Sequence, residues 1–317
     1  MRAEDAPGPT LVVAVERLPP GAMALAGELA ALRAALARTP YARLNKIALY
    51  GASHRPDSDL DYRFVQALPG GAFDFRTGCG HSLLACVVAA ARPGPVTVHA
   101  LTTGDRVRCT PQDPGGAHGR PARHTLHFLR APTAPGTLPT GHPVDVLGSV
   151  PVSLVRYGNP YVFVDARHLG VPNAPALLRA GDDVRRVLLA LRAHAARLLG
   201  HDDGSALPKI AAFSAQGGEV AVRALTVGGW HPHLALTGAA ALAAAGALPG
   251  TVVPDLAGRP VRVPGGRTVN VTAEAGHVAV RHKRATVLDR LELPWRLPAD
   301  PPADPPADPP WRIHATA

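Results

Sequence analysis

The chain has 317 residues, of which 46% are hydrophobic and 18% charged, and this composition excludes an intrinsically disordered protein. The formal net charge is +9, but the basic residues are scattered along the chain and aromatic residues make up only 4%. With few rings to stack on bases and no zinc-finger spacing or basic helix, we expect no nucleic-acid partner.

The cysteines and the apolar stretches indicate a cytoplasmic protein. The chain has an odd number of cysteines, at Cys79, Cys86 and Cys109, and their spacing is not that of a disulfide framework. A secreted domain held together by disulfides is therefore not expected. The first residues include acids and no apolar run typical of a signal peptide. Residues 234–253 are long enough to span a bilayer, but they contain helix-breaking residues and fit a buried helix better. We expect no membrane partner, and a monomer or a homodimer.

The first half of the chain alternates strand and helix patterns. A glycine-containing turn is followed by a predicted apolar helix at 79–91, and the Pro- and Gly-rich residues 92–95 end this helix. The predicted elements are a strand at 10–16, a helix at 22–37, strands at 47–50 and 62–66, a helix at 79–91, and short strands between 96 and 155.

The second half repeats this plan. It has an amphipathic helix at 182–199, strands at 209–214 and 219–227, and a second apolar helix that ends at Pro249. A helix that is apolar on every side must be buried. We therefore predict an α+β fold with two pseudo-symmetric lobes, at 1–148 and 149–297, in each of which a β-sheet wraps around a central apolar helix. The Pro-rich repeat at 298–317 is expected to be a disordered tail.

Cys79 and Lys46 are the residues most suited to carry chemistry, and for Cys79 a purely structural role is an equal alternative. Cys79 lies between two glycines where a strand leads into a helix, and the positive end of a helix favours a negative charge there. Lys46 begins an apolar strand and could act as a base if its stem lies in a cleft, although a solvated lysine at a strand end is the more usual situation. The same alternative applies more strongly to Lys209. Cys86 and Cys109 fit buried, inert positions.

Cofactor sites are not indicated. His231 and His233 could suggest a metal, but HExxH and paired CxxC spacings are absent, and the glycine pairs do not fit GxGxxG or a P-loop. We expect neither a metal nor a cofactor. The predicted helix N-termini at 78–82 and 237–239 are instead suited to anions, because free N–H groups point outward there.

Several motifs, taken in order, resemble one known family. They are Asn45-Lys46-Ile47, DLDYRFVQ at 59–66, RTGCGH at 76–81, NPYVFVDARHLG at 159–170, LPKIAAF at 207–213, LTGAAALAAAGALPGTVV at 236–253 and KRATVL at 283–288. Together they are similar to the PrpF-type isomerases of the diaminopimelate-epimerase fold, which include methylaconitate isomerase and 4-oxalomesaconate tautomerase. The likeness runs from about residue 44 to residue 294.

The resemblance implies two lobes with a ligand cleft between them. It also implies cofactor-free proton transfer on a carboxylate substrate, with an allylic shift of a C=C bond or a tautomerisation. Lys46 and Cys79 match the catalytic lysine and cysteine of the family. We expect the substrate carboxylates to be bound by residues around the two helix N-termini. These residues are Arg76, Gly78, Gly80, His81, Ser82, His233, Thr237 and Gly238.

The chain departs from the family pattern where carboxylates are usually held. The N-terminal Arg-Gly-Gly-Thr-Ser run of the family is replaced by AVERLPPGAM, and a late GHPSG is reduced to VPGGRT. These changes favour a different unsaturated acid, in specialised metabolism. Two alternatives stay open: an epimerase or cyclising isomerase that uses His81 in place of a thiol, and a non-catalytic ligand-binding accessory protein. Retention of Lys46 and Cys79 favours catalysis.

Overall fold

The computed structural model describes residues 1–16, 18, 23–112, 122–202, 205–293 and 295. The predicted disordered tail at 298–317 lies outside these residues. Packing divides the chain into two units, of which the first holds Met1–Leu18 with Arg43–Leu291 and the second holds Pro19–Ala42 with Glu292–Ala317. The lobe boundary between residues 148 and 149 stays a prediction.

Among its described residues, the second unit has one α-helix. The helix α1 (Ala26–Leu36) follows the 3-10 turn η1 (Met23–Leu25) and buries Leu29, Leu32 and Leu36, which lie on one side of it. The Trp295 indole N–H donates a hydrogen bond to the carbonyl oxygen of Glu28 at 2.8 Å, which holds the Trp295 side chain beside the helix.

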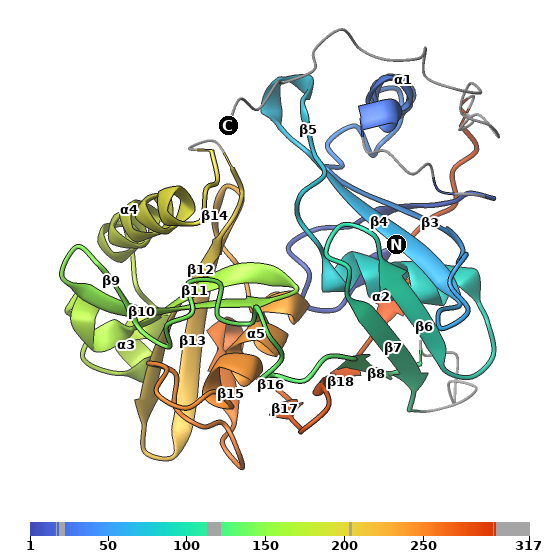
Figure 1. Ribbon diagram of the computed structural model, residues 1–317. Coiled ribbons are helices and arrows are strands. Elements are labelled where there is room, and N and C mark those ends of the chain that lie inside the picture. The colour runs from blue at the N-terminus through green and yellow to red at the C-terminus, as the bar shows by residue number, and fades with distance from the viewer. Residues whose placement is uncertain (17, 19–22, 113–121, 203–204, 294, 296–317) are drawn as a thin grey trace, which may run out of the picture. The chain divides into compact units, whose positions relative to one another are not determined.

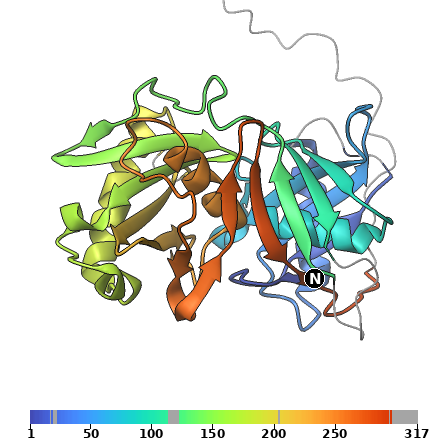
Figure 2. The same cartoon turned by 90° about the horizontal axis from the view of Figure 1, so that it is seen from below.

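The first unit has a mixed α/β architecture with two large sheets and few helices (Figure 1). The strands of the first sheet are β2 (Leu11–Ala14), β3 (Lys46–Ala52), β4 (Leu60–Ala67), β5 (Phe73–Asp74), β6 (Val96–Ala100), β7 (Arg106–Pro111), β8 (His124–Phe128), β17 (Val271–Ala273) and β18 (Val278–Lys283). They run in the order β17-β18-β8-β7-β6-β4-β3-β2, and β5 pairs with β4. Thus two strands from the second half of the chain belong to this sheet: β18 pairs with β8 and β17 pairs with β18, as the orange and green strands of Figure 2 show.

The second sheet has the same succession of pairings. Its strands are β9 (Asp145–Leu147), β10 (Val150–Tyr157), β11 (Asn159–Asp165), β12 (Lys209–Gln216), β13 (Glu219–Thr226), β14 (Gly229–Trp230), β15 (Val261–Val263) and β16 (Arg267–Val269). In the first sheet β2 is parallel to β3, β3 antiparallel to β4, and β4 parallel to β6. In the second sheet β11, β12, β13 and β15 pair in that same sequence. A small separate pair joins β1 (Arg2–Ala3) to β19 (Ala285–Thr286).

Each large sheet is accompanied by one apolar helix. The helix α2 (Gly80–Ala90) lies between β5 and β6 in the chain, and α5 (Leu236–Gly246) lies between β14 and β15. Every residue of α5 from Leu236 to Ala245 is buried, because a helix without a polar face has no side to expose. The other described helical segments are η2 (Pro69–Gly71), η4 (Ala166–Leu169), α3 (Ala174–Leu178), α4 (Asp182–Leu198) and η5 (Pro264–Gly266).

Most predicted elements are found close to their expected bounds. The helices predicted at 79–91 and 182–199 correspond to α2 and α4. The apolar stretch 234–253 is helical only up to Gly246, where a Cβ atom would lie 2.6 Å from the Pro254 carbonyl oxygen, so the chain turns back tightly at this point. Within the part of the chain that the structure describes, no helix has the length and hydropathy needed to cross a membrane.

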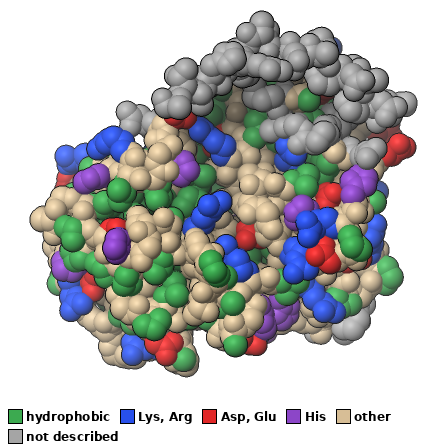
Figure 3. Space-filling view, viewed as in Figure 1, with side chains coloured by type: hydrophobic (Ala, Val, Ile, Leu, Met, Phe, Trp, Pro, Cys, Tyr) green, Lys and Arg blue, Asp and Glu red, His purple; other side chains and the backbone are tan. Residues whose placement is uncertain are grey.

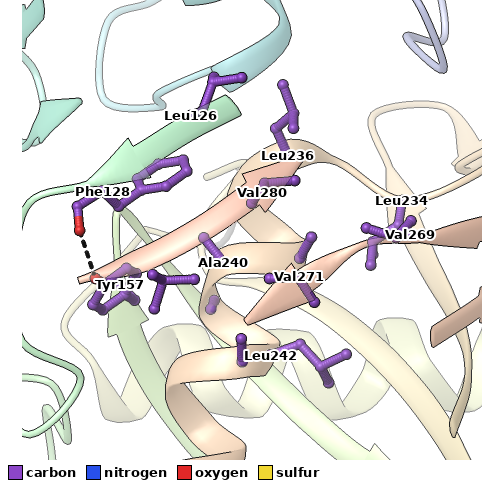
Figure 4. Packing of buried hydrophobic residues seen from close by; sticks show 14 of the residues in the cluster. Leu126, Phe128, Tyr157, Leu234, Leu236, Ala240, Leu242, Val269, Val271 and Val280 are labelled. Atoms are coloured by element: carbon purple, nitrogen blue, oxygen red, sulfur yellow. Dashed lines mark hydrogen bonds between the residues drawn. The ribbon is translucent and has the colours of Figure 1, made fainter. Parts of the chain in front are cut away.

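The main core is continuous between strands of the two large sheets. Leu126 and Phe128 of β8 pack with Tyr157 of β10 and with residues of α5 and β18 (Figure 4). The Tyr157 hydroxyl donates to the Phe128 carbonyl oxygen at 3.0 Å, so the ring is buried without an unpaired polar group. This core holds α2 and α5 in fixed places relative to the strands beside them.

Candidate active site

The loop that leads into α2 places Cys79 at the helix N-terminus. Cys79 has an extended backbone (φ −138°, ψ 105°), and its carbonyl oxygen accepts hydrogen bonds from the Tyr62 hydroxyl and the Leu83 N–H, both at 2.9 Å. Its side chain makes no capping hydrogen bond and is partly exposed, whereas Cys86 and Cys109 are buried. The Cys79 thiol is therefore the one that a ligand can reach.

Asn159 of the second sheet fixes this loop. Its Oδ1 accepts a hydrogen bond from the Gly78 N–H at 2.7 Å, and its Nδ2 donates to the Gly78 carbonyl oxygen at 2.9 Å. Asn159 is buried, so both bonds are shielded from water. The polar groups of Gly78, which we predicted to bind substrate, are thus used within the protein to hold the backbone before Cys79.

The N-termini of α2 and α5 lie against each other. A Cβ atom on Gly80 would be 2.7 Å from the Cβ atom of Leu236, so only glycine permits this approach. A Cβ atom on Gly238 would be 2.8 Å from the hydroxyl oxygen of Tyr161, which places that hydroxyl directly beside α5. Two glycines predicted to contact substrate are therefore required first of all by close packing.

Both helix N-termini have free donors. Among the described residues, no protein atom accepts a hydrogen bond from the backbone N–H groups of Gly80, His81, Thr237 and Gly238. The first N–H groups of a helix have no partner within it, and they carry the positive end of the helix dipole. Two such ends that meet beside a reachable thiol form a place suited to a negatively charged group.

Lys46 starts β3 in a row of polar side chains. In the strand register it lies opposite Gln66 of β4, which in turn lies opposite Asp74 of β5. Residues directly opposite one another present their side chains on the same face of a sheet. Lys46 is only 9% exposed, and Gln66 and Asp74 are buried as well. The lysine stem is therefore in the protein interior, as the proposed base requires.

Two buried histidines stack beside Lys46. The rings of His81 and His231 have centroids 6.3 Å apart and planes inclined by 17°. Burial, and then neighbouring positive charges that include Lys46, lower the pKa of His81 well below its usual range and that of His231 to about 4. Both rings are thus neutral at pH 7.

The ring nitrogens of this histidine pair differ in their partners. Nδ1 of His231 lies 3.1 Å from the His233 N–H and accepts its hydrogen bond, so the proton of the neutral His231 ring is assigned to Nε2. Nε2 of His81 is buried and has no partner among the described residues. An unpaired buried nitrogen is unfavourable unless a ligand or water completes its bonding, so His81 is suited to contact a bound ligand.

A cavity of about 580 Å³ borders His233. Nδ1 of His233 lies 3.1 Å from the carbonyl oxygen of Pro264, and its Nε2 lies 3.8 Å from Asp5. Basic residues that also line the cavity are Arg2, Arg267 and Arg284. Elsewhere Lys and Arg side chains are spread over the surface rather than gathered in one patch, on the face that Figure 3 shows.

Three of the predicted binding residues already have partners in the protein. Arg76 is half exposed, and its guanidinium forms an ion pair with Asp202 at 2.9 Å. Ser82 is fully buried, with its hydroxyl 2.9 Å from that of Thr10. Thr237 is buried at the start of α5 and forms a hydrogen bond with Tyr161. Their roles toward a substrate stay predictions.

The structure brings Lys209, His231 and Asn159 to the site, although the sequence analysis had not assigned them there. Lys209 begins β12, and the charges of Cys79 and Lys46 both act on it. One signal was available: the chain has only three lysines among 33 basic residues, and two of them begin the LNKIALY and LPKIAAF strands. In the described residues, no group of three or more His, Cys, Asp or Glu side chains could hold a metal ion.

Comparison with known families and proteins gives a consistent result. Residues 112–288 match the model of a family described as PrpF protein. The (4E)-oxalomesaconate Delta-isomerase of Novosphingobium sp. strain KA1 is 26% identical over 243 residues, which cover 67% of this chain and 68% of that protein. The 4-oxalomesaconate tautomerase of Pseudomonas putida KT2440 is 28% identical over 243 residues and 67% of each chain.

A solved structure has a similar fold. The crystal structure of methylitaconate-delta-isomerase matches with a TM-score of 0.62 and 22% identity, over 90% of this chain and 92% of that one. At this level of identity the likeness concerns the fold alone.

Proposed function

The chain belongs to the PrpF family, whose model matches more than half of it, and we propose that it moves a proton on an unsaturated di- or tricarboxylate without a cofactor. The family and the isomerase class predicted from the sequence are both confirmed by the family match and by relatives named as an isomerase and a tautomerase. The reaction we propose is an allylic shift of a C=C bond or a tautomerisation. We place it in specialised metabolism, in the cytoplasm.

The observation that carries this proposal is the meeting of the α2 and α5 N-termini beside Cys79. Removal of a proton α or γ to a carboxylate spreads negative charge onto that carboxylate. The free N–H groups at Gly80, His81, Thr237 and Gly238 are fixed donors for such a charge. The neutral His81 and His231 rings add donors there without placing a further positive charge near the lysine.

Lys46 and Cys79 supply the two proton transfers. Lys46 acts as the base and takes a proton from the saturated carbon, and the C–H electron pair forms a dienolate that the helix N-termini stabilise. The Cys79 thiol then gives its proton to the far carbon of the former C=C bond. Arg76 and His233 bind the outer carboxylates, while Gly78 and Ser82 act through the loop and helix that their hydrogen bonds hold.

We also propose that the two large sheets with α2 and α5 are pseudo-symmetric lobes around central helices. The repeated sequence of parallel and antiparallel pairings supports this arrangement, as do the matching places of α2 and α5 in the chain. On this reading the two halves meet where the helix N-termini approach, and Lys46 and Lys209 occupy corresponding positions.

A panel of unsaturated di- and tricarboxylates, followed by proton NMR, tests the proposed function. We expect one or more acids to be converted to a double-bond isomer by the wild type and not by Lys46→Met or Cys79→Ala. Cys109→Ala is the matched control, because Cys109 is a buried cysteine that the mechanism does not use. Tight binding of an acid without conversion would favour the accessory-protein alternative, and conversion that survives both substitutions would contradict the assigned residues.

A further inference from the structure

Lys209 is directed toward the site by the register of the second sheet. In the parallel pair of β11 and β12, Lys209 is the partner of Tyr161. Tyr161 lies against Gly238 of α5, and Asn159, two residues earlier on β11, holds Gly78. Residues two apart on a strand share a face, as do register partners on adjacent strands. The Lys209 side chain therefore lies on the sheet face that meets the N-termini of both helices.

The charged neighbours of Lys209 come from two strands, one helix and the loop before α2. Burial is the largest influence and lowers the pKa of Lys209, with a net result of about 8. The negative charges of Asp74 on β5 and of Cys79 raise it, and the positive charges of Arg192 on α4 and of Lys46 on β3 lower it. A lysine in this range both holds and releases a proton near neutral pH.

The proposed reaction leaves an extra proton on Lys46 and removes one from Cys79. After one turnover Lys46 is an ammonium and Cys79 is a thiolate, whereas the next turnover needs a neutral amine and a thiol. Lys209 lies on the sheet face that meets both helix N-termini, and its charge interacts with the charges of Lys46 and Cys79. None of the steps assigned so far uses the half-buried Lys209 amine.

We propose that Lys209 is the residue that returns the proton from Lys46 to Cys79. The Lys209 ammonium gives a proton to the Cys79 thiolate, and its neutral Nζ then takes a proton from the Lys46 ammonium. An N–H bond of Lys209 breaks as the S–H bond forms, an N–H bond of Lys46 breaks as a new one forms on Lys209, and the Lys46 amine, the Lys209 ammonium and the Cys79 thiol are restored. The proton return rests on the proposed function, but the charge interaction between Lys209 and Cys79 can be tested without any substrate.

Alkylation of Cys79 by iodoacetamide measures this charge interaction, because the other two cysteines are buried. A neighbouring ammonium favours the thiolate, which is the reactive form. We expect Lys209→Met to slow alkylation at pH 7 roughly tenfold, because the ammonium that favours the thiolate is removed. Lys209→Arg, which keeps the positive charge, should alkylate like the wild type, and so should Lys283→Arg, the matched lysine control. A wild-type pH profile in folded Lys209→Met would overturn the proposal.

Lysine NMR gives a second readout that does not depend on Lys209→Met folding. The chain has three lysines, so ¹³C-lysine labelling gives three side-chain signals, and the loss of one in Lys209→Arg assigns it. We expect Lys209 to titrate near pH 8. Its pKa should fall in Cys79→Ala, because the charge of Cys79 raises it in the wild type. A titration above pH 10, or no response to Cys79→Ala, would overturn the proposal even if a substrate is found.

Discussion

Substitution of Gly80 by alanine should separate the two helix N-termini that form the centre of the site. The added Cβ atom would lie 2.7 Å from the Cβ atom of Leu236, whereas ordinary contact is 3.4–4 Å, so the helices must move apart by between 0.7 and 1.3 Å. Overpacking of this kind costs about 1–3 kcal/mol in the free energy of unfolding. A displacement of about 1 Å at reacting groups can lower the rate by about 100-fold. We therefore expect a folded but less stable protein whose kcat falls by about two orders of magnitude.

Denaturant unfolding and steady-state turnover measure the two effects of Gly80→Ala. Gly27→Ala is the matched control, because Gly27 is also a helical glycine and has nothing within 4 Å of an added Cβ atom. The control should keep full activity and gain slightly in stability, since alanine favours helix more than glycine does. Wild-type stability together with wild-type kcat in Gly80→Ala would refute the view that close approach of α2 and α5 builds the site.

Three further substitutions test separate parts of the site. Asn159→Ala removes both side-chain hydrogen bonds to Gly78, so the free energy of unfolding should fall by about 1–3 kcal/mol. The effect on kcat should be larger than the effect on KM. Unaltered unfolding and kinetics would contradict this expectation. Because burial lowers the His231 pKa from 6.5 to about 4, the unfolded chain takes up a proton first as pH falls. Stability should therefore decrease from pH 6.5 to pH 4 by about 3 kcal/mol, and thermal melts of His231→Asn should show a shallower decrease; equal slopes would count against a buried neutral ring. Lys209→Arg cannot release a proton, so rapid-quench kinetics should show a normal first turnover and slow later ones, whereas a normal steady-state rate would exclude proton return through Lys209.

The sequence alone predicted those structural features that are determined by short segments of the chain. The absence of a polar face in 79–91 and in the alanine-rich stretch after Leu236 predicted two buried helices, and α2 and α5 are buried. The position of Cys79 between glycines predicted a helix N-terminus, which the structure has. These features depend on side-chain patterning and on backbone freedom, which short segments carry by themselves.

Features that depend on distant contacts could not be predicted in the same way. His81 stacks on His231 across 150 residues of chain, and Arg76 pairs with Asp202 from the other half. Lys209 looks like an ordinary strand-end lysine until the register with Tyr161 places it on the inner face. Burial and neighbouring charges arise only on folding, so their effects on pKa cannot be predicted from any single sequence motif.

Deuterium uptake tests the central claim most directly. In D2O, proton NMR of a converted acid should show enzyme-dependent exchange at the allylic carbon with the wild type and with Cys109→Ala. The account predicts that exchange is lost in Lys46→Met and in Cys79→Ala, because each removes one of the two groups that carry the proton. Exchange at the wild-type rate in both of these variants would contradict the account, and would place the proton transfer on other residues.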